Sequence, residues 1–165
     1  MPTSWKRSPE ELHKTYISNT EAFYKSAGWS LSEELDNFIT ACALRLWARS
    51  GAVTQEHVDA ANQLYSKGRP APKWLLWELT TAVCDGAGEL LPPLFFWSLA
   101  EEDKQKGKNT SRLFVRMLTN ILLYLAAVND DVSYDEAEFI TECVDRLGAI
   151  CDSNEVSEIF TELFR

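Results

Sequence analysis

The stretch "SRLFVRMLTNILLYLAAV", residues 111–128, carries apolar side chains on nearly every side of the helix that its composition favours. A helix on the surface of a protein has one apolar stripe and one polar face, whereas a helix that is apolar all round is buried among other elements. The sequence therefore predicts a central helix that begins at Asn109 or Thr110 and is surrounded by the rest of the fold.

Helix start and stop signals divide the remainder of the chain into further helices. "SPEE", from Ser8, combines an N-cap, a proline at the first helical position and a capping-box glutamate, and "SLSE", from Ser30, repeats the capping box. Glycines that follow apolar runs, such as Gly28, Gly51 and Gly148, are typical helix ends. No segment alternates apolar and polar residues between turn signals, so no sheet is expected. The prediction is an all-α fold of seven or eight helices over about 8–25, 30–50, 54–67, 72–84, 93–104, 110–128, 133–147 and 153–165.

The size and composition of the chain fit one domain. With 165 residues, 45% hydrophobic and 12% aromatic, it is long enough to bury a sizeable core. We therefore predict a single helical domain over 1–165, either a whole protein or the N-terminal part of a longer one. The N-terminus has no apolar h-region, and the longest apolar run, Leu90 to Leu99, contains two prolines and is too short to span a bilayer. We expect no membrane insertion and a cytoplasmic location.

The cysteines and histidines are too few and too scattered to predict a metal centre. The four cysteines form no C-x-x-C pair, and two histidines accompany them. Buried reduced thiols are expected instead of a zinc site or a disulfide framework. His57 is interpreted as an exposed residue on the first turn of its helix. These cysteines and histidines are Cys42, Cys84, Cys143, Cys151, His13 and His57.

The net charge of −9 lies entirely in the C-terminal part of the chain. Residues 1–128 carry 14 basic and 14 acidic side chains, whereas residues 129–165 carry 2 and 11. Such a field repels nucleic acid and anionic membranes, and it attracts a basic protein or a divalent cation. A solvated helix face is the simpler interpretation. The acidic residues expected to contact a protein partner are Glu138, Glu142 and Asp145.

The acidic stretch "AAVNDDVSYDEAEF", residues 126–139, is a candidate cation-binding loop. An EF-hand loop needs Gly at its sixth position and Glu at its twelfth, but in the best register Tyr134 and Ile140 stand there. Ser133 and Glu136 instead have the spacing of a capping box for the next helix. The stretch is therefore predicted to be a helix, a turn and a capped helix. The candidate ligands that remain for Ca²⁺ or another divalent cation are Asp131 and Glu136.

The longer stretch "YLAAVNDDVSYDEAEFITECVDRLG", residues 124–148, resembles the signature hairpin of TerB-like domains of the tellurite-resistance group. That pattern is an apolar helix, then A-D-G-x-(I/V)-S-x-x-E, then a second amphipathic helix. The resemblance covers about 25 of the 165 residues, and Asn129 and Asp130 stand where the family has Asp and Gly. It implies a compact helical module without catalytic activity, used for protein interaction in bacterial stress and defence systems. Acidic residues of this turn have been suggested as cation ligands in the family, which implies Asp131 and Glu136 here.

The chain has no evident catalytic constellation. "DGAGE", residues 85–89, has two glycines but lacks the preceding strand and the following Lys-Ser/Thr of a phosphate-binding loop. No convergent set of nucleophile, base and orienting residue is recognisable in the sequence. We expect no enzymatic activity.

Aromatic residues cluster around two proline-bearing turns: Trp74, Trp77, Phe95, Phe96 and Trp97. They are interpreted as core, because a small helical domain needs their large apolar area. The alternative is a groove for a partner's apolar side chains, containing Trp97 and rimmed by Lys104, Lys106 and Lys108.

These observations predict a non-catalytic helical interaction or regulatory module of a bacterial cytoplasm. Two alternatives stay open at this point. The first is an acidic immunity or inhibitor protein that binds a basic toxin or nuclease through its C-terminal face. The second is a sensor domain that binds a divalent cation.

Overall fold

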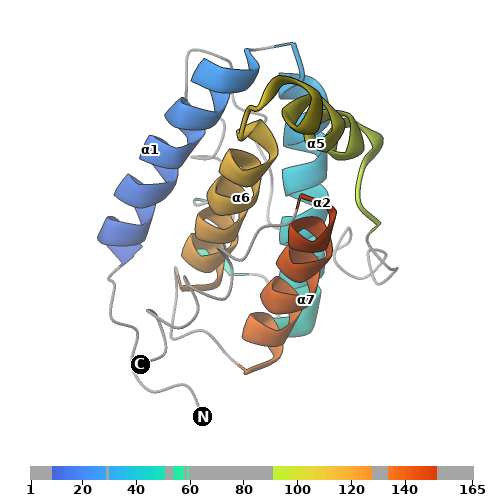
Figure 1. Cartoon of the computed structure of the whole chain (residues 1–165). Coiled ribbons are helices and arrows are strands. Elements are labelled where there is room, and N and C mark those ends of the chain that lie inside the picture. Colours follow the sequence, from blue (N-terminus) through green and yellow to red (C-terminus); the bar gives the residue numbers. More distant parts are fainter. Residues whose placement is uncertain are drawn as a thin grey trace.

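The computed structural model describes residues 9–28, 30–50, 54–57, 59, 91–127 and 134–151. Within these ranges the regular elements are helices and there is no strand, which confirms the all-α prediction. The labelled helices of Figure 1 are α1 (Pro9–Ala27), α2 (Ser32–Ser50), α5 (Leu94–Lys106), α6 (Thr110–Ala127) and α7 (Tyr134–Ile150).

The central helix of the fold is α6, as the sequence predicts. Fifteen of its eighteen residues are buried, and it contacts α1, α2, α5 and α7. Two of its buried polar side chains donate hydrogen bonds within the helix. The Thr119 hydroxyl donates to the Val115 carbonyl at 2.7 Å, and the Asn120 amide donates to the Arg116 carbonyl at 3.0 Å. Such bonds let polar residues occupy an otherwise apolar helix.

The four long helices pack side by side, and α5 crosses one end of them (Figure 1). α6 lies against α1 and runs antiparallel to it, and α7 lies against α2 and runs antiparallel to it. Buried side chains from all five helices form one hydrophobic cluster. Among the described residues, no helix has both the length and the apolar character needed to cross a membrane.

Several predicted helix ends are confirmed. Pro9 is the first helical residue of α1, where its fixed φ suits the helix and its missing N–H costs nothing. Gly28 follows α1 with a φ of +78°, and its N–H donates to the Tyr24 carbonyl at 2.8 Å. Tyr134 is the first residue of α7, which fits Ser133 as N-cap, although Ser133 lies outside the described residues.

The start of α2 and the end of α7 differ from the prediction. α2 begins at Ser32, and the Leu31 carbonyl accepts the first helical hydrogen bond, from the Leu35 N–H at 2.9 Å, so Leu31 occupies the N-cap position predicted for Ser30. α7 continues through the buried Gly148 to Ile150. A glycine inside a helix costs only about 1 kcal/mol, and Ile150 packs against the core, so packing overrides this stop signal.

Thr54 caps the next helix as predicted, but the prediction that His57 is exposed is wrong. The His57 N–H donates to the Thr54 hydroxyl oxygen at 3.3 Å, and the Thr54 N–H donates to His57 Nδ1 at 3.1 Å. His57 therefore fills the reciprocal role of the capping-box glutamate. Its ring is 2% exposed and stacks on Trp47 at 5.0 Å between centroids. Stacking on an aromatic residue of α2 is a tertiary contact that the local sequence does not specify.

The interpretation of the aromatic cluster as core is confirmed for Phe95 and Phe96. Phe96 is fully buried, and both rings lie 5.6 Å from the ring of Phe114 between centroids. Trp97, in contrast, is 52% exposed. Trp74 and Trp77 lie outside the described residues.

Two tyrosines between α1 and α6 predict a loss of stability at high pH. The rings of Tyr16 and Tyr124 lie 5.3 Å apart, and burial raises the pKa of both phenols. The unfolded chain ionises its tyrosines near pH 10, so below that pH both states are protonated and no stability is lost. Above about pH 10 the unfolded state gains free energy from ionisation that the folded state resists. We therefore expect the free energy of unfolding to fall as the pH rises above about 10.

Urea unfolding of the wild type and Tyr16→Phe, measured between about pH 8 and pH 11, checks this expectation. The variant has no phenol at position 16 and is expected to lose less stability over the alkaline part of the range. Parallel curves for the two proteins would contradict the role given to Tyr16.

Candidate functional site

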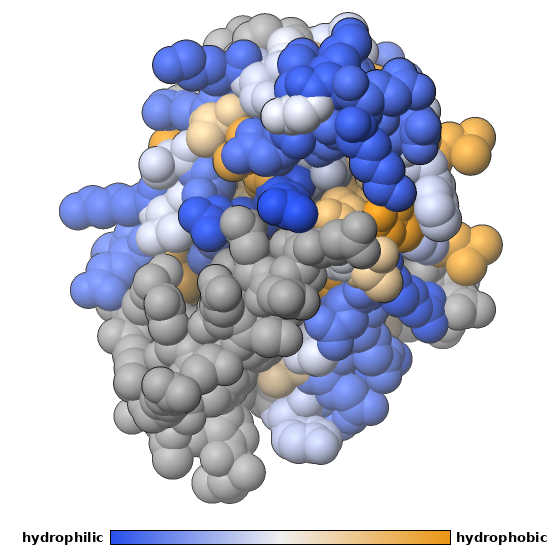
Figure 2. All heavy atoms as spheres, viewed as in Figure 1, coloured by the Kyte–Doolittle hydropathy of each residue, from blue (hydrophilic) through white to orange (hydrophobic). Residues whose placement is uncertain are grey.

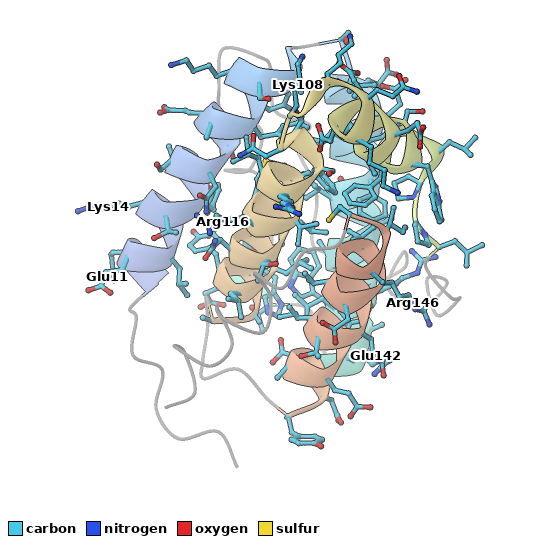
Figure 3. The ribbon with its side chains drawn as sticks, viewed as in Figure 1. Glu11, Lys14, Lys108, Arg116, Glu142 and Arg146 are labelled. Atoms are coloured by element: carbon cyan, nitrogen blue, oxygen red, sulfur yellow. The ribbon has the colours of Figure 1, made fainter. Side chains whose placement is uncertain are left out.

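A row of four carboxylates follows one face of α7. Asp135, Glu138, Glu142 and Asp145 are spaced by three, four and three residues, which places them on the same side of a helix. All four residues are exposed, and Figure 3 labels Glu142 on the outer side of α7. We call these residues the carboxylate stripe. The sequence predicts three of its members as partner contacts, namely Glu138, Glu142 and Asp145.

One member of the carboxylate stripe is partly neutralised by a neighbouring helix. The guanidinium of Arg49, on α2, lies 3.6 Å from the carboxylate of Glu142 and 5.7 Å from the centre of the Phe139 ring. Both charged side chains are about half exposed, so this ion pair contributes little to stability. The other three carboxylates form no ion pair within the described part of the chain. The stripe therefore presents a net negative charge to solvent.

Three large apolar side chains stand exposed at the start of α5. The exposed fractions of Leu91, Leu94 and Trp97 are 69%, 85% and 52%. Figure 2 shows apolar groups projecting from the right-hand edge of the molecule, on the side where the chain enters α5. We call these residues the apolar edge. Exposed apolar patches of this kind often mark interaction sites.

The three lysines predicted to rim a groove have different surroundings in the structure. Lys104 follows Trp97 by seven residues and is exposed on the same face of α5. Lys106 and Lys108 each lie 3.5 Å from a carboxylate oxygen of Glu102. Lys104 is therefore the one rim lysine that forms no ion pair within the described part of the chain.

A small hollow, open to solvent, lies where the chain entering α5 meets α7 and α2. Arg146 projects from α7 on this side of the molecule (Figure 3). The hollow brings one residue of the apolar edge next to the helix that carries the carboxylate stripe. The lining residues are Phe38, Leu91, Pro92, Cys143, Arg146 and Leu147.

The described cysteines are free thiols, and two of them meet across helices. Cys42 and Cys151 are buried, as predicted, and Cys143 is partly buried. The Sγ atoms of Cys42, on α2, and Cys143, on α7, are 4.0 Å apart. Burial raises the pKa of Cys42. The hydrogen bond from the Cys42 thiol, followed by the positive charges of Arg146 and Arg45, lowers the pKa of Cys143. The sequence does not predict this pair, because its members are 101 residues apart.

The residues proposed as cation ligands are not brought together within the described ranges. Glu136 is buried, with an exposed fraction of 5%, in the first turn of α7, and Asp131 lies outside the described residues. In the part of the chain that is described, no three His, Cys, Asp or Glu side chains are grouped so that they could hold a metal ion. Cation binding at Asp131 and Glu136 stays a prediction, and calorimetric titration of the wild type and Asp131→Ala with Ca²⁺ tests it.

Comparison of the chain with protein-family models, curated proteins and solved structures found no match. The resemblance of residues 124–148 to TerB-like domains therefore stays a hypothesis. The geometry of α5 and α7 is the basis for a functional proposal.

Proposed function

We propose that this protein is a non-catalytic helical module, TerB-like in character, that binds another protein in a bacterial stress-response or defence system. The observation that carries the proposal is the carboxylate stripe on the outer face of α7. The apolar edge at the start of α5 also supports the proposal. Its exposed Leu and Trp side chains are unfavourable in water, and such patches often mark interaction sites. The implied partner carries basic side chains next to apolar ones.

The two features have different physical roles in the proposed interface. Exposed carboxylates steer a basic partner and set its orientation, and they contribute mainly to the association rate. Burial of the apolar edge would remove exposed Leu and Trp area from water and would slow dissociation. Glu142 is already paired with Arg49, so the members of the stripe that are free to pair with a partner are Asp135, Glu138 and Asp145.

A second candidate is an immunity or inhibitor protein that blocks a basic toxin or nuclease. The carboxylate stripe favours it, because an enzyme that binds nucleic acid has a basic surface that a row of acids can cover. The two candidates differ in the partner. An inhibitor abolishes the partner's nuclease or toxic activity, whereas a regulatory module need not do so.

Reversing the charge of the stripe is expected to slow association with the partner. In the variant Glu138→Lys, Glu142→Lys, Asp145→Lys, the association rate with a partner captured by the wild type should fall roughly tenfold or more, because the steering field changes sign. Affinity capture followed by surface plasmon resonance at about 0.1 M and 0.5 M salt measures this. Wild-type binding should weaken at the higher salt, because screening shortens the range of the field.

A matched control separates local from overall charge. The variant Glu11→Lys, Glu21→Lys, Glu56→Lys changes the same number of exposed acids and reaches the same net charge, but its changes lie on α1 and on the helix that Thr54 caps. It should bind as the wild type does. An equal fall in the association rate of both variants, or binding that is insensitive to salt, would contradict an interface on α7.

A further inference from the structure

We propose that Cys42 and Cys143 form a redox-active pair, in which Cys143 reacts with hydrogen peroxide and Cys42 completes a disulfide within the chain. The pair is a modification site, and its chemistry does not depend on the proposed function.

The geometry of the two thiols supports their direct reaction. Their Sγ atoms are 4.0 Å apart, so an approach of about 2 Å brings them to the length of a disulfide bond. Each thiol lies on a long helix that packs against the other, so the approach needs a side-chain rotation and a small helix movement. A disulfide here would tether α2 to α7.

The surroundings of the two sulfur atoms make Cys143 the reactive thiol and Cys42 its partner. Cys143 lines the hollow at the start of α5 together with Arg146, so a small reagent reaches it from solvent. Cys42 is fully buried behind it. The reactive species of a cysteine is the thiolate, and nearby positive charge favours that form. The hydrogen bond from Cys42 and the charges of Arg146 and Arg45 lower the pKa of Cys143, whereas burial keeps Cys42 a thiol.

The hollow suits a small oxidant. It is open to solvent and has room for about one water-sized molecule, and most of its lining residues are apolar. Hydrogen peroxide is a small neutral molecule, so it can approach the sulfur without charged side chains to bind it. In a reducing compartment, disulfides are mostly transient and used for sensing, which fits a pair that is reduced in the resting protein.

The proposed reaction has two steps that balance. The Cys143 thiolate attacks one oxygen of hydrogen peroxide, the O–O bond breaks, and the hydroxide that leaves takes a proton to become water. Cys143 is then a sulfenic acid. Cys42 sulfur attacks the Cys143 sulfur, the S–O bond breaks, and the departing hydroxide takes the Cys42 proton to become a second water. The two sulfur atoms lose two electrons in total, and these reduce the peroxide.

Peroxide treatment of the reduced full chain tests the proposal. We expect the loss of two free thiols per chain without dimerisation, and digestion with mass spectrometry should recover a peptide that links Cys42 to Cys143. In Cys143→Ser the rate of thiol loss should fall by roughly tenfold or more, because the reactive thiolate is absent. The matched control Cys151→Ser removes a buried thiol of α7's C-terminal end and should react as the wild type does.

Three further variants distinguish a reactive pair from a structural one. In Cys42→Ala the sulfenic acid at Cys143 has no partner and should be trapped by dimedone. Arg146→Gln should raise the pH midpoint of Cys143 alkylation by iodoacetamide, and Arg146→Lys should restore it, because the charge returns. The wild-type peptide map decides the matter even where a variant fails to fold. Unreacted thiols, a disulfide between two chains, or a link that omits Cys42 or Cys143 would overturn the proposal.

Discussion

Replacing Phe114 with alanine is expected to lower the free energy of unfolding by about 3 to 5 kcal/mol, which is the range for large aromatic residues removed from a core. Phe114 is fully buried on the central helix. Its ring lies within 6.1 Å, between centroids, of four other rings from α1, α2 and α5. Those rings belong to Phe23, Phe38, Phe95 and Phe96.

The size of this effect follows from the position of Phe114 between three neighbouring helices. Its removal leaves a cavity that the rings from several helices cannot fill together without moving those helices apart. Urea unfolding followed by circular dichroism measures the change. Leu94→Ala is the matched control, because Leu94 is 85% exposed and its loss should change stability by no more than about 0.5 kcal/mol. A decrease in the free energy of unfolding of less than about 1 kcal/mol for Phe114→Ala would contradict the packing described for α6.

Replacing Asp103 with alanine is expected to lower the free energy of unfolding by about 1 to 3 kcal/mol, because its carboxylate caps a helix other than its own. The backbone N–H of Thr110 donates to Oδ1 at 3.1 Å, and that of Ser111 donates to Oδ2 at 2.7 Å. The Ser111 hydroxyl also donates to Oδ2. Asp103 on α5 therefore satisfies two of the first N–H groups of α6, which have no partner inside that helix.

The backbone of Asp103 belongs to the same junction. Its carbonyl accepts the N–H groups of Gly107 and Lys108, and Gly107 has a φ of +66°, which glycine adopts without strain. One residue thus ends α5 with its backbone and begins α6 with its side chain. Loss of the carboxylate should fray the start of the central helix.

Thermal and urea unfolding of Asp103→Ala measure the loss, and hydrogen exchange at the amides of Thr110 and Ser111 locates it. Glu101→Ala is the matched control, since it removes an exposed acid two residues away whose partner is Gln105. Asp103→Asn keeps a carbonyl acceptor, so its free energy of unfolding should fall less than that of Asp103→Ala. Equal stability in Asp103→Ala and Glu101→Ala would show that the cap is not needed.

Features that depend on a few neighbouring residues were predictable from the sequence. The central helix was predicted over 111–128 and is observed as Thr110–Ala127, because a run that is apolar on all sides can only be buried. Pro9 and Gly28 bound α1 as predicted, since their effects on φ act within one turn. The spacing of Glu138, Glu142 and Asp145 likewise follows from helical periodicity.

Features that depend on which helices meet were not predictable in this way. His57 was expected to be exposed, but it stacks on Trp47. Gly148 was expected to end α7, but core packing carries the helix to Ile150. At Gly148 the tertiary contact outweighs a local preference of about 1 kcal/mol.

The sequence by itself determined the helical class, the central position of α6 and the one-sided row of acids on α7, because each follows from the periodicity of a single helix. The tertiary structure alone decided three other things. It placed Cys143 beside Cys42, it set the carboxylate of Asp103 at the start of α6, and it left Leu94 exposed while Phe95 and Phe96 are packed. The physical reason is that packing side chains at close-packed density selects one arrangement of the helices, and that arrangement fixes which distant residues meet.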